Sequence, residues 1–153
     1  TSPESINQMI DFKNRNLTVV PGLLKIINEI IDNSIDEAIR TDFKFANKID
    51  IKVEKDEIKN SYFVLVSDNG RGIPIVEHNG IYQAEVAWTK ARAGTSFTDA
   101  RSTIGANGVG SFATNCFSTY FHGESSDGSK RKVSVKCFDN CDPDKIKTEL
   151  KKK

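Results

Sequence analysis

The alternation of apolar and polar residues is most regular between residues 21 and 40. Apolar side chains recur there at the spacing of one helix face, about 100° per residue; they are Ile27, Ile30, Ile31, Ile35 and Ala38. The opposite face carries polar side chains at the same spacing, namely Glu29, Asn33, Asp36 and Arg40. Pro21 suits the first position of a helix. The pattern therefore predicts one amphipathic helix from Pro21 to Arg40.

Two pairs of strands are predicted after this helix. Residues 48–54 alternate between apolar and polar, as a half-buried strand does, and residues 62–66 are almost continuously apolar, which predicts a more fully buried strand. Residues 117–122 and 132–138 form the second pair, and Asp127-Gly128 supplies the hairpin signal between them.

The remaining segments are assigned by the same rules. We expect a short capped helix over residues 2–10, a helix over 81–93 and an irregular, mobile loop over 94–103. A second glycine-led helix is expected to run to about residue 118, and the tail at 144–153 to be a short charged helix or a frayed end. No repeat or low-complexity linker divides the chain, which predicts a single domain over residues 1–153.

Composition narrows the possible classes of protein. The chain has 153 residues, of which 37% are hydrophobic and 28% charged, and its net charge of +1 gives no field that would by itself argue for a nucleic acid or membrane partner. No apolar run approaches the roughly 20 residues of a membrane span. The three cysteines fit reduced thiols in an intracellular protein, in the cytoplasm of the host cell, better than a metal site. Because the first residue is Thr1 and not Met, we expect an excised or processed piece.

Three glycines precede the second predicted helix, and they could bind an anion. Gly105, Gly108 and Gly110 leave backbone N–H groups free to approach a phosphate, and the helix adds its positive N-terminal end. The spacing is neither a Walker A loop nor a Rossmann loop. A plain glycine loop is the alternative. Without its own lysine, such a phosphate loop needs positive charge from a metal ion or from another segment.

The polar face of the first helix offers the metal ligand and a base. The amide oxygen of Asn33 suits Mg²⁺, which retains several waters and takes few protein ligands. Glu29 lies one turn earlier, where it could accept a proton from a water that attacks a γ-phosphate. The alternative is an exposed helix face without function.

A turn of Asp and glycines follows the second strand. The carboxylate of Asp68 could accept the exocyclic amine proton of adenine, and Gly70 and Gly72 would let a flat base approach the backbone. A common Asp-Asn-Gly turn is the alternative. Arg71 could pair with Glu37 and tie this turn to the helix, or the two could form a surface pair of little energetic value.

The polar helix face, the Asp-glycine turn and the glycine loop together indicate a protein family far more specifically than any one of them does alone. Asp32–Ala38, Asp68–Pro74 and Gly105–Gly110 resemble, in order and spacing, the nucleotide-binding motifs of the GHKL (Bergerat-fold) ATPases, and among these the type II DNA topoisomerases. Lys44–Ile49 further resembles the branch found in T-even-type bacteriophages. The resemblance covers about residues 20–139. It implies an α/β two-layer sandwich with helices on one face of a mixed, largely antiparallel sheet.

The resemblance also implies a role for each matching residue. Glu29 matches the general base, Asn33 the Mg²⁺ ligand and Asp68 the acceptor for the adenine amine. Ser96 falls where family members contact ribose or phosphate. The phosphate-binding lid corresponds to Gly105, Ala106, Asn107, Gly108, Val109 and Gly110, and the supporting residues are Glu37, Arg71, Gly70 and Gly72. Two family features have no counterpart here: an adenine-supporting Gly-Thr segment, and a lysine that reaches the γ-phosphate from a following transducer domain.

The resulting hypothesis is an ATPase domain of a type II DNA topoisomerase that uses ATP and Mg²⁺. In the parent protein we expect DNA and other topoisomerase subunits as partners, a homodimer that closes when ATP binds, and no membrane. A nucleotide-binding module without turnover is the alternative, because the transducer lysine is absent. A DNA-binding piece is a third hypothesis, motivated by Lys130-Arg-Lys132 and the lysine-rich tail.

Overall fold

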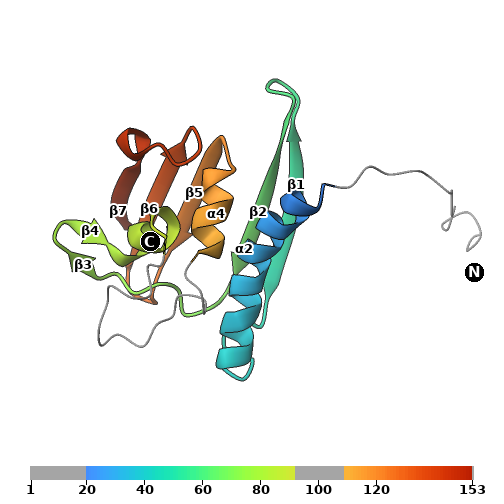
Figure 1. The fold of residues 1–153 in the computed structure, drawn as a ribbon. Helices are drawn as coiled ribbons and strands as arrows, with labels where there is room; N and C mark the ends of the chain where they lie inside the picture. The colour runs from blue at the N-terminus through green and yellow to red at the C-terminus, as the bar shows by residue number, and fades with distance from the viewer. Residues whose placement is uncertain (1–19, 92–108, 153) are drawn as a thin grey trace, which may run out of the picture.

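The computed structural model describes residues 20–91 and 109–152 (Figure 1). Its elements follow one another as α2 (Pro21–Arg40), β1 (Ile49–Asp56), β2 (Ser61–Asp68), β3 (Glu77–His78), β4 (Ile81–Tyr82), α3 (Gln83–Thr89), α4 (Gly110–Cys116), β5 (Tyr120–Ser125), β6 (Arg131–Phe138), a 3₁₀ turn η2 (Pro143–Lys145) and β7 (Lys147–Lys152).

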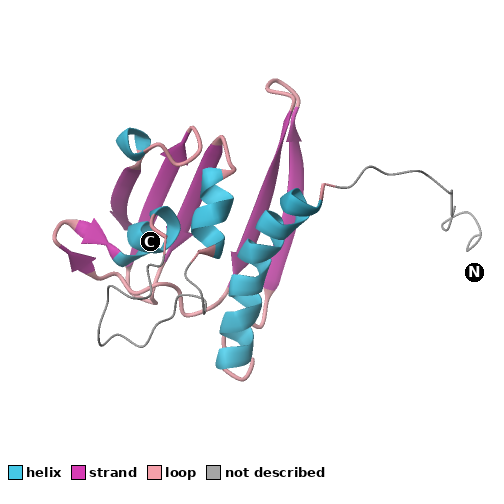
Figure 2. Cartoon of the chain, viewed as in Figure 1, coloured by secondary structure: helices cyan, strands magenta, loops and turns pink. Residues whose placement is uncertain are grey.

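The described residues form two halves (Figures 1 and 2). In the first, here called the α2 half, helix α2 packs beside the antiparallel hairpin β1–β2. In the second, the three-stranded half, α3 and α4 accompany an antiparallel sheet in the order β5–β6–β7. The combination of helices with antiparallel sheets confirms the expected fold class. Among the described residues, the strands form separate ladders and not one continuous sheet.

Helix α2 has the predicted bounds. Pro21 occupies its first turn, and the helix ends where the N–H and the hydroxyl of Thr41 both bond to the carbonyl of Glu37, at 3.1 and 2.8 Å. Its orientation differs from the expectation, however. The side chains that it buries are Ser34, Glu37 and Ala38, while Ile35 and Ile39 are exposed. The polar side turns partly inward because it binds the neighbouring loops, as described below.

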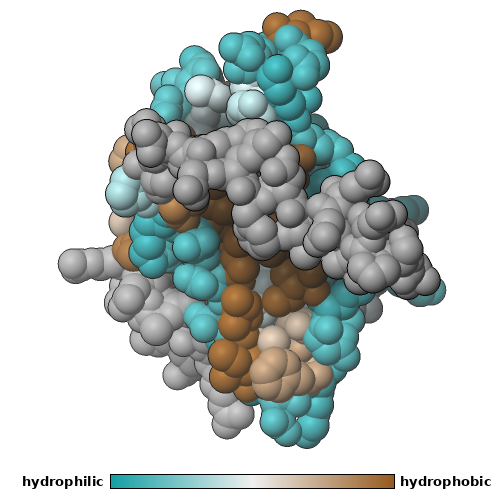
Figure 3. Space-filling model, turned by 90° about the vertical axis from the view of Figure 1, so that its right-hand side faces the viewer, coloured by the Kyte–Doolittle hydropathy of each residue, from teal (hydrophilic) through white to brown (hydrophobic). Residues whose placement is uncertain are grey.

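The β1–β2 hairpin is in the predicted place, but the predicted burial of its second strand is wrong. Val53 pairs with Val64 and Ile51 with Val66, yet the apolar side chains Tyr62 and Leu65 are 69% and 60% exposed. In the described part of the chain, α2 is the element that packs on this hairpin, and it meets β2 near Asp68. Figure 3 faces this side of the molecule and shows a band of apolar atoms between polar flanks.

The apolar core lies in the three-stranded half. Val133, Val135 and Cys137 point from β6 toward α3 and are essentially inaccessible. The indole of Trp88 packs on β5 at Gly123, where an added Cβ would lie 2.6 Å from the ring. A side chain at position 123 would therefore displace the tryptophan from the core.

Several predicted boundaries are corrected by the structure. The tail predicted as a helix or frayed end is strand β7, which pairs antiparallel with β6 and places Leu150 opposite Val133. The helix predicted over 81–93 spans only Gln83–Thr89, since residues 81–82 pair with β3 across a two-residue turn. Helix α4 ends at Cys116, and β5 begins three residues later than predicted, at Tyr120. The hairpin at Asp127-Gly128 is confirmed.

The predicted helix over residues 2–10 and the predicted loop over 94–103 lie outside the described residues. Within the described ranges, none of the helices combines the length and the apolar character needed to cross a membrane. The division of the chain into domains stays a prediction.

Candidate functional site

The polar face of α2 meets the start of α4. Asn33 donates from Nδ2 to the hydroxyl of Ser111 over 2.8 Å. One turn earlier, the Glu29 carboxylate lies so close to Gly110 that a Cβ at that position would overlap Oε2. Only glycine fits at position 110 with the Glu29 side chain in this conformation. The helix block and the glycine block identified in the sequence are therefore in contact.

Helix α4 is also attached to the backbone of α2. The hydroxyl of Thr114 donates to the carbonyl of Ile26 over 2.7 Å and lies 3.0 Å from the carbonyl of Gly110. The side chain thus links the two helices within one turn of Glu29. This contact fixes where the first turn of α4 lies relative to the α2 carboxylate.

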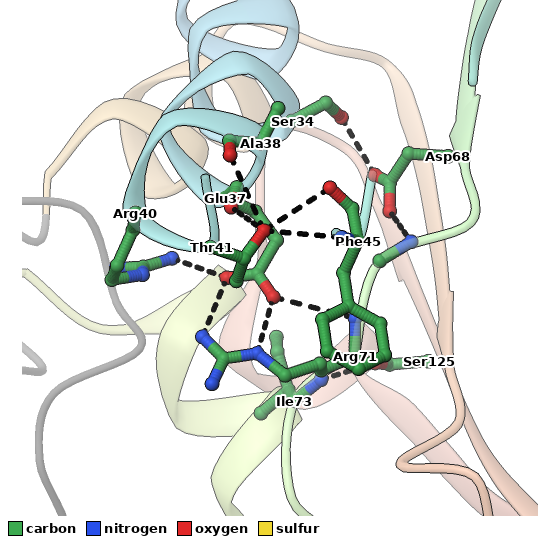
Figure 4. Close-up of polar contacts among 11 residues, drawn as sticks. Ser34, Glu37, Ala38, Arg40, Thr41, Phe45, Asp68, Arg71, Ile73 and Ser125 are labelled. Atoms are coloured by element: carbon green, nitrogen blue, oxygen red, sulfur yellow. Dashed lines mark hydrogen bonds and ion pairs between the residues drawn. The ribbon is translucent and has the colours of Figure 1, made fainter. Parts of the chain in front are cut away.

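Asp68, at the end of β2, is held by two donors (Figure 4). Its Oδ2 accepts from the hydroxyl of Ser34 at 2.6 Å, and its Oδ1 accepts from the backbone N–H of Gly70 at 2.8 Å. A carboxylate can accept about four hydrogen bonds, so capacity for a ligand remains. Ser34 was not singled out in the sequence, because it lies off the polar stripe of the helix; its position directly after Asn33 was the available signal.

Arg71 and Glu37 form the pair that the sequence suggested, and it is not a weak surface pair. Arg71 Nε and Nη2 lie 2.7 and 3.1 Å from the two carboxylate oxygens, and Arg40 Nη2 adds a third contact at 2.7 Å (Figure 4). Glu37 is only 9% exposed. The hydrogen bond from Arg71, with a smaller contribution from Arg40, lowers the pKa of Glu37 to about 2. Arg71 also lies over the Phe45 ring at 5.9 Å.

The turn after Asp68 is anchored on the three-stranded half. Gly72 has φ +72°, and a Cβ there would overlap the backbone of Ser126. The Ile73 N–H then donates to Ser125 Oγ over 2.7 Å, and the Ile75 N–H donates to the Asp127 carboxylate over 3.0 Å. The turn that carries Asp68 therefore joins the two halves of the molecule.

Charge near Glu29 comes from its own helix. Lys25 Nζ lies 2.6 Å from Glu29 Oε1, one turn away on α2. The hydrogen bond to Glu29 raises the pKa of Lys25. Since the lysine side chain is 67% exposed, this pair contributes little to stability, and the lysine is free to leave the carboxylate when another group approaches.

Part of the predicted site lies outside the described residues, namely Ser96 and the lid positions Gly105, Ala106, Asn107 and Gly108. Val109 is described and caps the start of α4. Within residues 20–91 and 109–152, no group of three His, Cys, Asp or Glu side chains could hold a metal ion. Among the described residues beside Gly110, Asn33 has an amide oxygen of the kind that can take part in binding a cation.

Comparison with known proteins gives this arrangement its context. Residues 18–139 match the family model of the histidine kinase-, DNA gyrase B- and HSP90-like ATPases. The chain belongs to this ATPase family. The matched range begins just before α2 and ends after β6, so it contains every described site residue.

Individual relatives of this ATPase domain are DNA topoisomerases and gyrases. The chain is 48% identical to the DNA topoisomerase large subunit of Enterobacteria phage T4 over 125 residues, which are 77% of this chain and 23% of that protein. It is 33% identical to DNA topoisomerase 2 of Saccharomyces cerevisiae over 146 residues, 90% of this chain and 10% of that protein. For the DNA gyrase B protein of Staphylococcus aureus the identity is 42% over 101 residues, 63% of this chain and 14% of that protein. The chain thus spans less than a quarter of the length of these relatives.

Membership in the ATPase family identifies ATP as the ligand. The three sequence blocks that suggested a nucleotide site meet around α2, through Ser111 and Gly110 on one side and Asp68 on the other. The fold thereby brings together residues that are up to 81 positions apart in the sequence.

Proposed function

We propose that this chain is the ATP-binding and ATP-hydrolysing domain of a type II DNA topoisomerase. In the parent protein, binding of Mg²⁺-ATP would bring two copies together, and this closure would drive the passage of one DNA segment through another. The names of its relatives, a DNA topoisomerase large subunit, DNA topoisomerase 2 and the DNA gyrase B protein, support the choice of parent.

The observation that supports this proposal most strongly is that two separate segments, the start of α4 and the end of β2, contact the same part of α2. Within two turns, the helix presents Glu29 against Gly110, Asn33 against Ser111 and Ser34 against Asp68. A helix whose polar face were merely solvated would not make three such contacts with two separate segments.

Asp68 is proposed to recognise the base. Ser34 and the Gly70 N–H fix both carboxylate oxygens, so the remaining lone pairs have a set direction. An exocyclic amine is a donor that these lone pairs can accept. Hydrogen bonds to a charged group contribute about 1.5–3 kcal/mol, which makes this contact a main source of base affinity.

Asn33 is proposed to hold Mg²⁺. Its amide nitrogen is occupied by Ser111, so its amide oxygen is the atom left to accept a cation, and amide oxygens suit this hard ion. When bound, Mg²⁺ would neutralise charge on the phosphate oxygens. The chain itself would add backbone N–H groups from the start of α4, beginning at Gly110.

Glu29 is proposed as the general base. It projects from the middle of α2 toward the first turn of α4, where the terminal phosphate would lie if the glycines bind phosphate. Its carboxylate could then accept a proton from the attacking water. Lys25, the exposed partner of this carboxylate, would have to be displaced from Oε1 or share it with that water.

A calorimetric titration with a non-hydrolysable ATP analogue, with and without Mg²⁺, tests the binding part of this proposal. We expect saturable binding that weakens when the cation is chelated, and binding that is indifferent to the cation would contradict the Mg²⁺ assignment. Phosphate release in the parent protein tests the turnover part. Binding without release there would favour a module that binds nucleotide and does not hydrolyse it.

A further inference from the structure

The sheet β5–β6–β7 has a second face, turned away from α3 and the core, that the nucleotide site does not use. The strand register places four lysines on this face in two directly opposed pairs, Lys132 with Lys151 and Lys136 with Lys147. Like charges directly opposite each other on a sheet destabilise it. Because the opposed lysines occur twice along the same strands and do not stabilise the sheet, we looked for a binding role for them.

The acidic side chains on this face offset only part of the lysine charge. Glu124 lies 2.8 Å from Lys132 and 3.7 Å from Lys151, and Glu149 lies 3.3 Å from Lys151. All three contacts involve the pair nearest the β5–β6 turn. Both glutamates are therefore engaged at one end of the lysine face.

Lys136 and Lys147, at the other end, have no ion pair with any described residue. Lys147 instead lies over the Phe138 ring at 5.8 Å. Lys145, on the neighbouring 3₁₀ turn, is neutralised by Asp139 at 2.6 Å and Asp142 at 3.5 Å, so the turn adds no net positive charge. The unbalanced charge of the face resides in Lys136 and Lys147.

The pKa of His122 is influenced by the charged side chains on this face. It lies on β5 opposite Lys136 and bonds Ser134 at 3.0 Å. Burial lowers its pKa first of all; Glu124 acts in the opposite direction, and Lys136, Lys151 and Lys132 each lower it further. The lysines on this face therefore act in the same direction as burial and favour the neutral form of the imidazole.

The small net charge of the chain does not show that acidic and basic side chains lie in different regions of the fold. Helix α2, in the other half of the molecule, carries four acidic side chains against two basic ones, whereas the lysine face carries four lysines against two glutamates. Net charge alone, at +1, gave no reason to expect a polyanion partner. The fold sorts the charges by region, and one sheet face becomes basic.

We propose that the lysine face of β5–β6–β7 binds the phosphate backbone of duplex DNA without reading its sequence. The two lysines of a pair lie on neighbouring strands about 4.8 Å apart, and the two pairs are four residues, or roughly 14 Å, apart along the strands. The four ammonium groups therefore cover a length over which a DNA strand carries about four phosphates. The face is broad and built of flexible lysines, which suits backbone contact and not base readout. This surface is separate from the nucleotide site, so the inference does not depend on ATP turnover.

Fluorescence anisotropy with a labelled duplex of about 30 base pairs, without nucleotide, tests this inference on the 153-residue chain. We expect log K to fall linearly with log salt concentration, and the double substitution Lys136→Gln with Lys147→Gln to make the slope shallower by nearly 2, at about 0.9 per lost phosphate contact. The matched control is Lys44→Gln with Lys59→Gln, which removes the same charge from two exposed lysines outside this face; it should leave the slope unchanged.

Two further measurements decide how a negative or ambiguous result is read. Lys136→Arg with Lys147→Arg keeps the charge and should keep the salt slope. That result would show that the shallower slope of the glutamine variant comes from the lost charge and not from loss of folding. The inference would be overturned if the Lys44/Lys59 control reduced the salt slope as much as the Lys136/Lys147 variant does, or if the Lys136/Lys147 variant left the slope unchanged. Binding of polyglutamate as tight as that of the duplex would also overturn it. Because titration with the ATP analogue should be unaffected in all of these variants, its failure would concern the proposed function and not the lysine face.

Discussion

Val133, Val135 and Cys137 are sealed inside the three-stranded half, while apolar side chains of the α2 half such as Val53 and Leu65 remain more than half exposed. The buried residues of α2 are instead Ser34, Glu37 and Ala38, two of them polar. One half is thus held by apolar packing, and the other half is held at its boundary by hydrogen bonds and ion pairs.

This difference places the candidate site where polar contacts replace packing. Asn33 binds Ser111 of α4, and Glu37 binds Arg71 in the turn whose next residues contact the three-stranded half. The residues that join the halves are therefore also residues of the candidate site or their neighbours. A polar boundary can rearrange at a lower free-energy cost than a close-packed one. A nucleotide bound as proposed would therefore contact residues that connect the two halves.

The largest expected effect distinguishes ATP hydrolysis from ATP binding at this boundary. In the parent protein, Glu29→Gln should retain ATP binding but lower hydrolysis by about 10²–10⁴, because an amide fills the same space and cannot accept a proton. Asp42→Asn, an exposed change just after the end of the same helix, is the control and should alter neither quantity. Steady-state phosphate release and calorimetry measure the two quantities, and hydrolysis at the parent rate would remove Glu29 from the mechanism.

The next effect concerns base recognition. Asp68→Asn should weaken binding of the ATP analogue at least tenfold, since an amide can present a donor to the adenine amine and the lost contact is of the charged type, about 1.5–3 kcal/mol. Asp50→Asn, on the exposed part of β1 beside Lys48, should leave affinity unchanged. Calorimetry checks both variants, and unaltered affinity in Asp68→Asn would contradict the adenine assignment.

Sequence reasoning located these residues but not the way in which the halves meet. The bounds of α2 followed from Pro21 and the helical period, which are local properties. The burial of β2 did not follow, because apolar composition shows what a strand could bury and not which element covers it. Strand β7 was missed because its charged residues fit a helix as well as a strand; the deciding contact, Leu150 opposite Val133, is non-local.

A third prediction tests whether ionic contacts hold the boundary. The folded pKa of Glu37, about 2, lies below its ordinary value of 4.5, so its ionisation stabilises the fold above that ordinary value and the contribution disappears as pH falls toward 2. Glu37→Gln should lower the free energy of unfolding by about 1–3 kcal/mol near neutral pH. Urea unfolding at several pH values should show the gap to the unmodified chain closing between about pH 4.5 and 2. Glu54→Gln, on exposed β1, is the control, and a gap that does not depend on pH would rule out the ionic explanation.

The smallest expected effect asks whether Ser34 directs the Asp68 carboxylate or merely fills space beneath it. Ser34→Ala removes the 2.6 Å bond and should weaken ATP binding by about two- to tenfold, the value of one hydrogen bond of about 0.5–1.5 kcal/mol. Ser67→Ala, exposed on β2, should have no effect. Inosine triphosphate distinguishes the two roles, because its base lacks the exocyclic amine that Asp68 is proposed to accept. If Ser34 directs that carboxylate, the variant loses affinity for ATP and keeps its affinity for the inosine nucleotide. Equal losses for both nucleotides would mean that Ser34 supports the packing of α2 on β2, and that the direction of Asp68 is set by Gly70 alone.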